Sequence, residues 1–201
     1  ENLMLLQIRN QLRPDADAGC TAFSLATCAT GSSVVGQNWD NDPALEPFFA
    51  LAADLDVPTL IHCEGAAGAS ERFRLRDGDP RLLEDVLHRH PGLRLWVENA
   101  GYPYLEGIIA VMYRYPQVYA DLSTITWIIP RPEFYRYLKA LMDAGLGKRL
   151  MWGSDQMNWP GSIDLAVRAV EEAPFLSEEE KRDLFYNNAV RFLGLDGPRG
   201  R

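Results

Sequence analysis

The sequence predicts an α/β fold built on a parallel sheet of about four strand–helix units, and three observations support this. From residue 43 onward, short apolar runs rich in β-branched residues alternate with longer segments of helical spacing. The segments between them are short, as βα connections usually are. The chain has 201 residues, 47% of them hydrophobic, which is enough for a full core. Parallel units carry their chemistry where the strands end and the loops begin.

The predicted elements alternate regularly along the chain. The predicted strands are TLIHC at 59–63, LRLWVENA at 93–100, VYADLST at 118–124 and RLMWGSD at 149–155. The predicted helices cover 43–57, 79–91, 104–116, 131–145, 162–173 and 177–195. Local signals support the boundaries: Asp79 and Pro80 begin one helix, Gly145 ends another, and Ser177 with Glu180 forms a capping box.

Residues 1–42 have a different character. The runs TAFSLAT and SSVVGQNW are short and β-prone, and the Gly/Ser-rich residues between them indicate a turn. We therefore expect a β-hairpin in an N-terminal segment 1–42, before a domain at 43–195 and a disordered tail at 196–201.

Composition excludes several classes of function. The net charge is −8 and no stripe of Lys and Arg with interleaved aromatics occurs, which argues against a nucleic-acid partner. No apolar run approaches the roughly 18 residues of a membrane span, and we expect a cytoplasmic protein without a leader. Three cysteines, Cys20, Cys28 and Cys63, lack CxxC spacing, so a disulfide framework is not expected.

Three of the four predicted strands end in polar groups: His62, Glu98 with Asn99, and Asp155. Asp121 lies in the remaining strand. Neutral imidazole and carboxylate suit a divalent metal such as zinc, which would activate water against a carbonyl substrate. The alternatives are a hydrogen-bonded core histidine at position 62 and a helix N-cap at position 155.

Two further patterns have competing interpretations. His88 and His90 form an HxH, but on a helix these side chains point in different directions and do not share one ion. Four aromatic residues at or beyond strand ends could line an apolar pocket for a small-molecule substrate, or could pack under the loops: Tyr102, Trp127, Trp152 and Trp159.

Residues 43–195 resemble the C-terminal half of the amidohydrolase-related family of metal-dependent TIM-barrel enzymes, on the motifs LIHCEG, NAGYP, YPQVYADLS, GKRLMWGSDQMNWP and KRDLFYNNAVRFLGL. The resemblance implies a partial (β/α)₈ barrel, with His62 as a metal ligand and Asp155 as the catalytic aspartate, which binds the metal or transfers the proton. Asn99 stands where the family commonly has histidine, and it would be a weaker ligand. The family's first-strand His-x-His has no counterpart, because residues 1–42 contain no histidine.

Residues 1–42 resemble the start of another family, the acyl-CoA:isopenicillin N acyltransferase-like hydrolases, on GCTAF and GQNWDND. That family uses an N-terminal nucleophile. The resemblance implies cleavage between Gly19 and Cys20, with Cys20 as the nucleophile and Asp40 as the carboxylate that orients it.

Three hypotheses follow. The first is a metal-dependent hydrolase of the amidohydrolase class, which hydrolyses or decarboxylates a small carbonyl or carboxylate substrate with His62, Asp155 and Asn99 around the metal and Glu98 in the substrate pocket. The second is a hydrolase or acyltransferase that uses Cys20. The third is a non-catalytic half-barrel that forms a homodimer through its open sheet edges.

Overall fold

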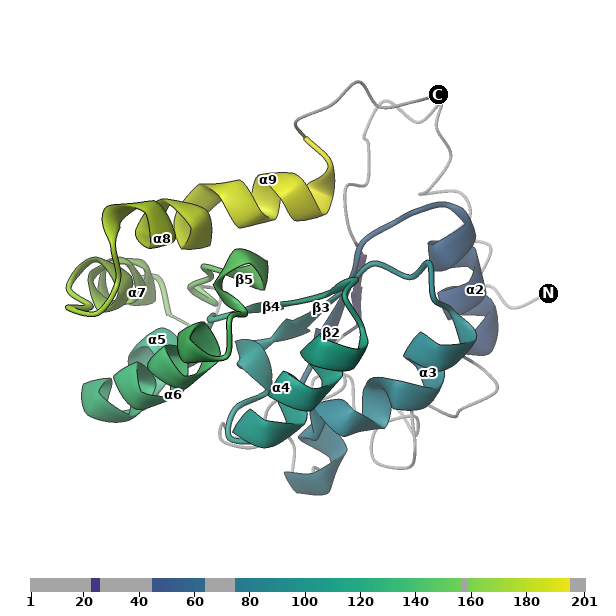
Figure 1. Ribbon diagram of the computed structural model, residues 1–201, viewed down its shortest axis with the longest axis horizontal. Coiled ribbons are helices and arrows are strands. Elements are labelled where there is room, and N and C mark those ends of the chain that lie inside the picture. The colour runs from purple at the N-terminus through teal and green to yellow at the C-terminus, as the bar shows by residue number, and fades with distance from the viewer. Residues whose placement is uncertain (1–22, 26–44, 64–74, 157–158, 196–201) are drawn as a thin grey trace.

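A computed structural model describes residues 23–25, 45–63, 75–156 and 159–195. Its centre is one sheet in which every pair of neighbouring strands is parallel and the strands follow chain order (Figure 1). The strands are β1 (Phe23–Leu25), β2 (Thr59–His62), β3 (Leu95–Glu98), β4 (Val118–Asp121) and β5 (Leu150–Met151). The α/β fold with a parallel sheet is therefore confirmed.

Strand β1 is an addition to the four strands that the sequence predicts. Phe23 pairs with Thr59 and Leu25 with Ile61, so β1 extends the sheet in parallel beside β2. The first run of the predicted hairpin is thus a strand, but its described partner is β2. The second run, SSVVGQNW, lies outside the described residues, as do Cys20, Cys28, Asp40 and the predicted tail.

The helices match the predicted segments, with three local differences. Their bounds are α2 (Glu46–Asp54), α3 (Glu84–Arg89), α4 (Leu105–Arg114), α5 (Ile125–Ile128), α6 (Arg131–Asp143), α7 (Ser162–Glu171), α8 (Glu178–Arg182) and α9 (Asn188–Leu193). The helix expected from Asp79 begins with a 3₁₀ turn at Pro80–Leu83, where the Asp79 carboxylate accepts the Arg81 N–H. Helix α5 was not expected. The helix expected over 177–195 is interrupted by a π-helical turn, Asp183–Asn187.

The two faces of the sheet have different neighbours. Side chains alternate along each strand, so the buried residues Ile61, Val97 and Ala120 face the helices that form the main core. On the opposite face Phe192 of α9 packs against Trp96 and Tyr119, with ring centroids 5.4 and 4.7 Å away. Figure 1 shows α8 and α9 on one side of the sheet and α3, α4 and α6 on the other.

The C-terminal segment also covers the edge of β5. Asn188 donates from Nδ2 to the carbonyls of Gly147 and Leu150, at 2.8 and 2.5 Å. The backbone N–H of Trp152 donates to the Leu184 carbonyl at 2.8 Å. Strand β5 is thus bonded on its outer side by the segment that follows it.

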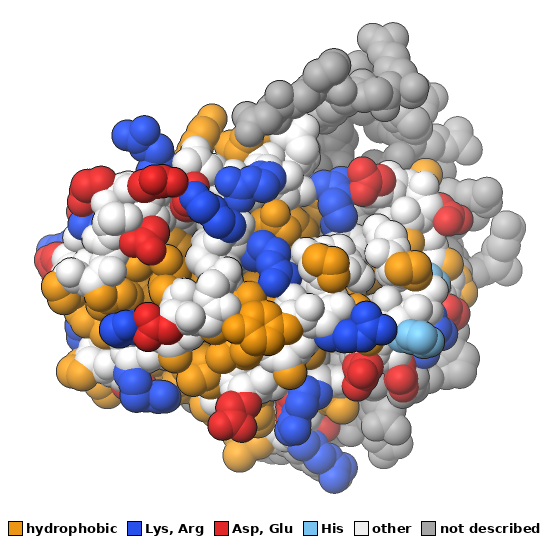
Figure 2. Space-filling view, viewed as in Figure 1, with side chains coloured by type: hydrophobic (Ala, Val, Ile, Leu, Met, Phe, Trp, Pro, Cys, Tyr) orange, Lys and Arg blue, Asp and Glu red, His pale blue; other side chains and the backbone are white. Residues whose placement is uncertain are grey.

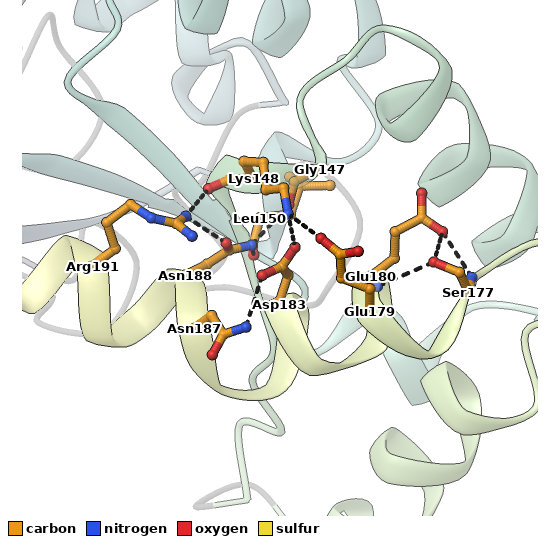
Figure 3. Close-up of polar contacts among 10 residues, drawn as sticks. All are labelled: Gly147, Lys148, Leu150, Ser177, Glu179, Glu180, Asp183, Asn187, Asn188 and Arg191. Atoms are coloured by element: carbon orange, nitrogen blue, oxygen red, sulfur yellow. Dashed lines mark hydrogen bonds and ion pairs between the residues drawn. The ribbon is translucent and has the colours of Figure 1, made fainter. Parts of the chain in front are cut away.

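Charged contacts reinforce this attachment (Figure 3). The Lys148 ammonium lies 2.5 Å from the Asp183 carboxylate and 3.1 Å from that of Glu179. The guanidinium of Arg191 donates to the Lys148 carbonyl at 2.9 Å. The predicted capping box at Ser177 and Glu180 is present and begins α8.

The surface of this side of the molecule is mixed. Figure 2 shows apolar side chains between charged side chains of both signs. Among the described residues, no helix is long and apolar enough to span a bilayer.

Candidate functional site

The carboxyl ends of β2 and β3 bring His62 and Glu98 together. The two residues are register partners in the parallel pair, so their side chains leave the sheet at the same level and on the same face. The Nδ1 atom of His62 lies 2.7 Å from Glu98 Oε2, and each side chain is about one-fifth exposed. When Nδ1 carries the proton to the carboxylate, Nε2 is the basic ring nitrogen, which is the tautomer that a metal ligand or a proton acceptor needs.

The loop after β3 turns sharply at Asn99. Asn99, Ala100 and Gly101 all have positive φ, at 58°, 47° and 64°. Asn tolerates this left-handed conformation better than most residues, whereas Ala does not. Helix α6 stabilises this turn, because Tyr137 of α6 donates its hydroxyl to the Ala100 carbonyl at 2.9 Å.

Asp121 ends β4 and lies beneath this loop. Its carboxylate accepts the Asn99 N–H at 3.2 Å, the Ser123 N–H at 3.1 Å and the indole N–H of Trp96 at 2.9 Å, and also the Ser123 hydroxyl. Burial, together with the nearby charge of Glu98, raises the pKa of Asp121 to about 7, against the lowering effect of these donors.

The loop after β4 connects Asn99 to Asp155. The backbone N–H of Thr124 donates to Asn99 Oδ1 at 2.9 Å, and its hydroxyl donates to Asp155 Oδ2 at 2.6 Å. Asp155 has a φ of 47°, another left-handed residue. The loops approach so closely that a Cβ on Gly153 would lie 2.5 Å from Ser123 Oγ, so a larger residue does not fit there.

These contacts form one continuous path across the carboxyl edge of the sheet. It runs from His62 to Glu98, through one peptide bond to Asn99, and then through Thr124 to Asp155. Three hydrogen bonds thus link residues that are far apart in the sequence, and they place the imidazole and the carboxylate on one connected framework.

The predicted aromatic residues divide between two places. Trp127 donates its indole N–H to the carbonyl of Ser154 at 2.8 Å, and its ring lies 6.0 Å from that of Trp159, which is half exposed. The Trp127 indole is thus bonded to the residue that precedes Asp155. The described contacts of the other two lie elsewhere: Tyr102 packs against Tyr137 and donates to Glu133, and Trp152 packs against Phe185.

The donor types at this edge fit a divalent metal in part. An imidazole whose other nitrogen meets a carboxylate, and a second carboxylate held by a hydroxyl, are common in metal sites. Asn99 is fully buried and its side-chain oxygen accepts from Thr124, so its described contact is with the neighbouring loop. Within the described ranges no three His, Cys, Asp or Glu side chains are grouped to hold an ion. Among the described residues His62 and Asp155 are therefore the candidate donors, and they do not form a complete ligand set.

Sequence reasoning missed the residues that connect the site. The sequence pattern places Asp121 in its strand without indicating a role, and it does not single out Ser123 or Thr124. A weak signal existed, because the segment ADLST places an acidic residue and two hydroxyls where a strand ends. Nothing in the sequence indicated which of them would reach a neighbouring loop.

The family is established by sequence comparison. The model of the Amidohydrolase family matches residues 30–195, which is most of the chain. The protein therefore belongs to the amidohydrolase family. The match begins inside the segment that was compared with the acyltransferase-like hydrolases, and no finding supports that second resemblance.

Solved structures agree on the fold. An amidohydrolase from Burkholderia multivorans with bound zinc is 19% identical, with a TM-score of 0.67 over 96% of this chain and 71% of that one. A putative 2-pyrone-4,6-dicarboxylic acid hydrolase from Pseudomonas putida is 20% identical, with a TM-score of 0.61 over 98% and 70%. A 2,6-dihydroxybenzoate decarboxylase from Rhizobium is 18% identical, with a TM-score of 0.56 over 79% and 57%.

The chain is shorter than these proteins. It spans between 52% and 71% of the length of the solved structures that it resembles. The parallel sheet with helices is consistent with part of a TIM barrel. No curated protein matches the sequence.

Proposed function

We propose that the chain carries the active-site edge of a metal-dependent hydrolase that acts on a small carbonyl or carboxylate substrate. The observation that carries this proposal is the hydrogen-bonded path from His62 to Asp155 along the carboxyl ends of β2 to β5. Parallel βα folds bind their substrates at this end of the sheet, and membership of the amidohydrolase family supports the reaction class.

In this proposal His62 and Asp155 hold one divalent ion, with zinc as the first candidate. Water and substrate would complete its coordination. When bound, such an ion would polarise the substrate carbonyl and lower the pKa of a water molecule.

The neighbouring residues have separate roles. Glu98 accepts the Nδ1 proton of His62, which fixes the ring orientation and keeps Nε2 basic. Asp155 keeps a carboxylate at the edge, where it can accept a proton from water during hydrolysis. Trp127 and Trp159 pack against each other, and Trp127 is bonded to the residue before Asp155, so this pair would contact the carbon skeleton of the substrate and exclude water.

Decarboxylation is the alternative reaction within the same family. One structural neighbour is named as a decarboxylase and another as a putative hydrolase, each at about 20% identity. The same edge would then bind a carboxylate substrate. Measuring both acid release from small lactones and CO₂ release from aromatic carboxylates separates the two reactions.

Zinc titration of the metal-free protein, followed by calorimetry, tests the proposal. We expect about one ion per chain for the wild type, and no measurable binding for His62→Ala or Asp155→Asn. His88→Ala and Asp164→Asn are matched controls, because both positions are exposed and lie outside the hydrogen-bonded path. Binding that survives in His62→Ala and Asp155→Asn, or that falls equally in the controls, would contradict it.

A further inference from the structure

Thr124 lies where the loops after β3, β4 and β5 meet. The residue is 3% exposed, and both of its donors are directed into the neighbouring loops. The backbone N–H donates to Asn99 on one side, and the hydroxyl donates to Asp155 on the other. A single residue thus joins the two loops that carry polar groups of the site.

Thr124 stands directly before a helix, where its hydroxyl would be expected to cap that helix, but it bonds to Asp155 instead. Thr124 precedes α5 at the N-cap position, where a threonine hydroxyl commonly accepts an N–H of the first helical turn. Here the hydroxyl makes no such bond, and α5 has no side-chain cap. The hydroxyl instead donates to Asp155 Oδ2 at 2.6 Å.

The backbone around Thr124 shows why such a bond matters. Asn99 and Asp155 both adopt left-handed conformations, which Asn and Asp tolerate better than other non-glycine residues but which contacts with the surroundings still stabilise. Thr124 contacts both residues. Asn99 is itself fixed, since it is fully buried and its N–H donates to Asp121.

We propose that Thr124 is a positioning residue of the site, and that it orients the Asp155 carboxylate from an anchor formed by Asn99. This inference rests on the proposed function, because it concerns the carboxylate assigned there to the metal. It also gives Asn99 a role: its side-chain oxygen fixes the Thr124 backbone rather than binding the ion. Substitution of Thr124 is therefore expected to change metal affinity more than stability.

The test compares two substitutions at the same position. Thr124→Ser keeps the hydroxyl, whereas Thr124→Val keeps the shape and loses it. Loss of a hydrogen bond to a ligating carboxylate typically lowers metal affinity by about 10–100-fold. We expect this loss of zinc affinity in Thr124→Val, measured by calorimetry, and affinity within about threefold of the wild type in Thr124→Ser.

The outcomes separate this inference from the function on which it rests. If Asp155→Asn abolishes zinc binding while Thr124→Val binds as the wild type does, the positioning role is wrong and the proposed function stands. If both Thr124 variants lose affinity equally, keeping the hydroxyl in Thr124→Ser does not preserve zinc binding, and the inference is also wrong. If the wild type binds no zinc, or Asp155→Asn binds it unchanged, both proposals fall.

Folding is controlled in the same series. Chemical denaturation of each variant shows whether a change in affinity accompanies a loss of structure. If Thr124→Val does not fold, Thr124→Ala replaces it, because it also removes the hydroxyl and adds no bulk. A purely structural role would lower the denaturation midpoint of these variants without changing their zinc affinity, and would overturn the proposal.

Discussion

At the scale of single residues, Asp121 is the most constrained group near the site. Its carboxyl is buried at the end of β4 and accepts hydrogen bonds from Trp96, Asn99 and Ser123. These donors favour the ionised form, whereas burial and the neighbouring Glu98 favour the neutral form more strongly. The carboxyl therefore changes its charge near neutral pH.

This pKa predicts a dependence of stability on pH. The folded-state pKa of Asp121 is about 7, against 3.8 for an unperturbed aspartate. Because the folded value is raised, the stabilising contribution of the proton is complete below pH 4. It is lost as the pH rises through 7, by at most about 1.4 kcal/mol of unfolding free energy per pH unit.

Asp121→Asn should flatten this dependence, because the amide mimics the protonated carboxyl. Urea denaturation between pH 5 and 7, the range below the folded-state pKa in which the two states differ in bound protons, measures the slope for both proteins. We expect the wild type to lose about 1 kcal/mol more per pH unit than the variant. Parallel slopes would show that Asp121 does not titrate in this range.

The sequence predicted His62 and Asp155 as neighbours for a simple reason. Both follow apolar runs that read as parallel strands, and parallel strands end at one edge. The links between them were not predictable, because Asn99, Thr124 and Asp155 meet through left-handed turns that the sequence pattern does not specify. The same limit applies to Tyr102, which lies near the predicted strand end but has its described contacts with α6.

At the scale of elements, the C-terminal segment from Ser177 to Leu193 does two things. It covers the outer side of β5 through Asn188 and Leu184, and it places Phe192 on the open face of the sheet. The amphipathic pattern predicted a helix here. It did not predict the π-helical turn at Asp183–Asn187, where Asp183 contacts Lys148, because a contact between residues so far apart in the chain leaves no local signal.

Adjacent asparagines in this segment provide a matched test. Asn188 is fully buried and donates to two backbone carbonyls, whereas Asn187 is half-buried and donates to Asp183. We expect Asn188→Ala to lower the free energy of unfolding by about 1–3 kcal/mol, since it leaves buried carbonyls without this donor. Asn187→Ala should cost less than about 1 kcal/mol. Equal losses in urea denaturation would argue against the importance of the β5 attachment.

Strand β1 shows a different limit of sequence reasoning. The run TAFSLAT was correctly read as β-prone, but propensity does not reveal the partner of a strand. A nearby turn signal favoured an antiparallel hairpin, whereas the described residues pair in parallel with β2, more than thirty residues away along the chain. The partner of such a strand is decided by the other strands of the sheet and not by the local sequence.

At the scale of the whole molecule, the chain combines a parallel sheet with a C-terminal helix, α9, that packs on one face of it. The sheet is consistent with part of a TIM barrel, and the chain spans 52–71% of the length of related structures. Phe192 of α9 packs on the face opposite the main core, against Trp96 and Tyr119. The C-terminal helix thus covers part of the sheet surface that the main helical layer leaves uncovered.

This arrangement also limits how copies could associate. The homodimer predicted from open sheet edges cannot use β5 without displacing the bonds from Asn188 and Leu184. The predicted homodimer would therefore form through the other edge of the described sheet, at β1. Light scattering at increasing protein concentration, on the wild type and on Asn188→Ala, would show which edge takes part.

In the proposed site, strands β2 to β5 bring His62 and Asp155 to one metal-binding edge. Anomalous diffraction at the zinc absorption edge, from crystals soaked in zinc, shows where the ion binds. We expect one strong peak within coordination distance of both the His62 imidazole and the Asp155 carboxylate. Zinc bound at any other place, or no peak between these two side chains, would overturn the proposed site.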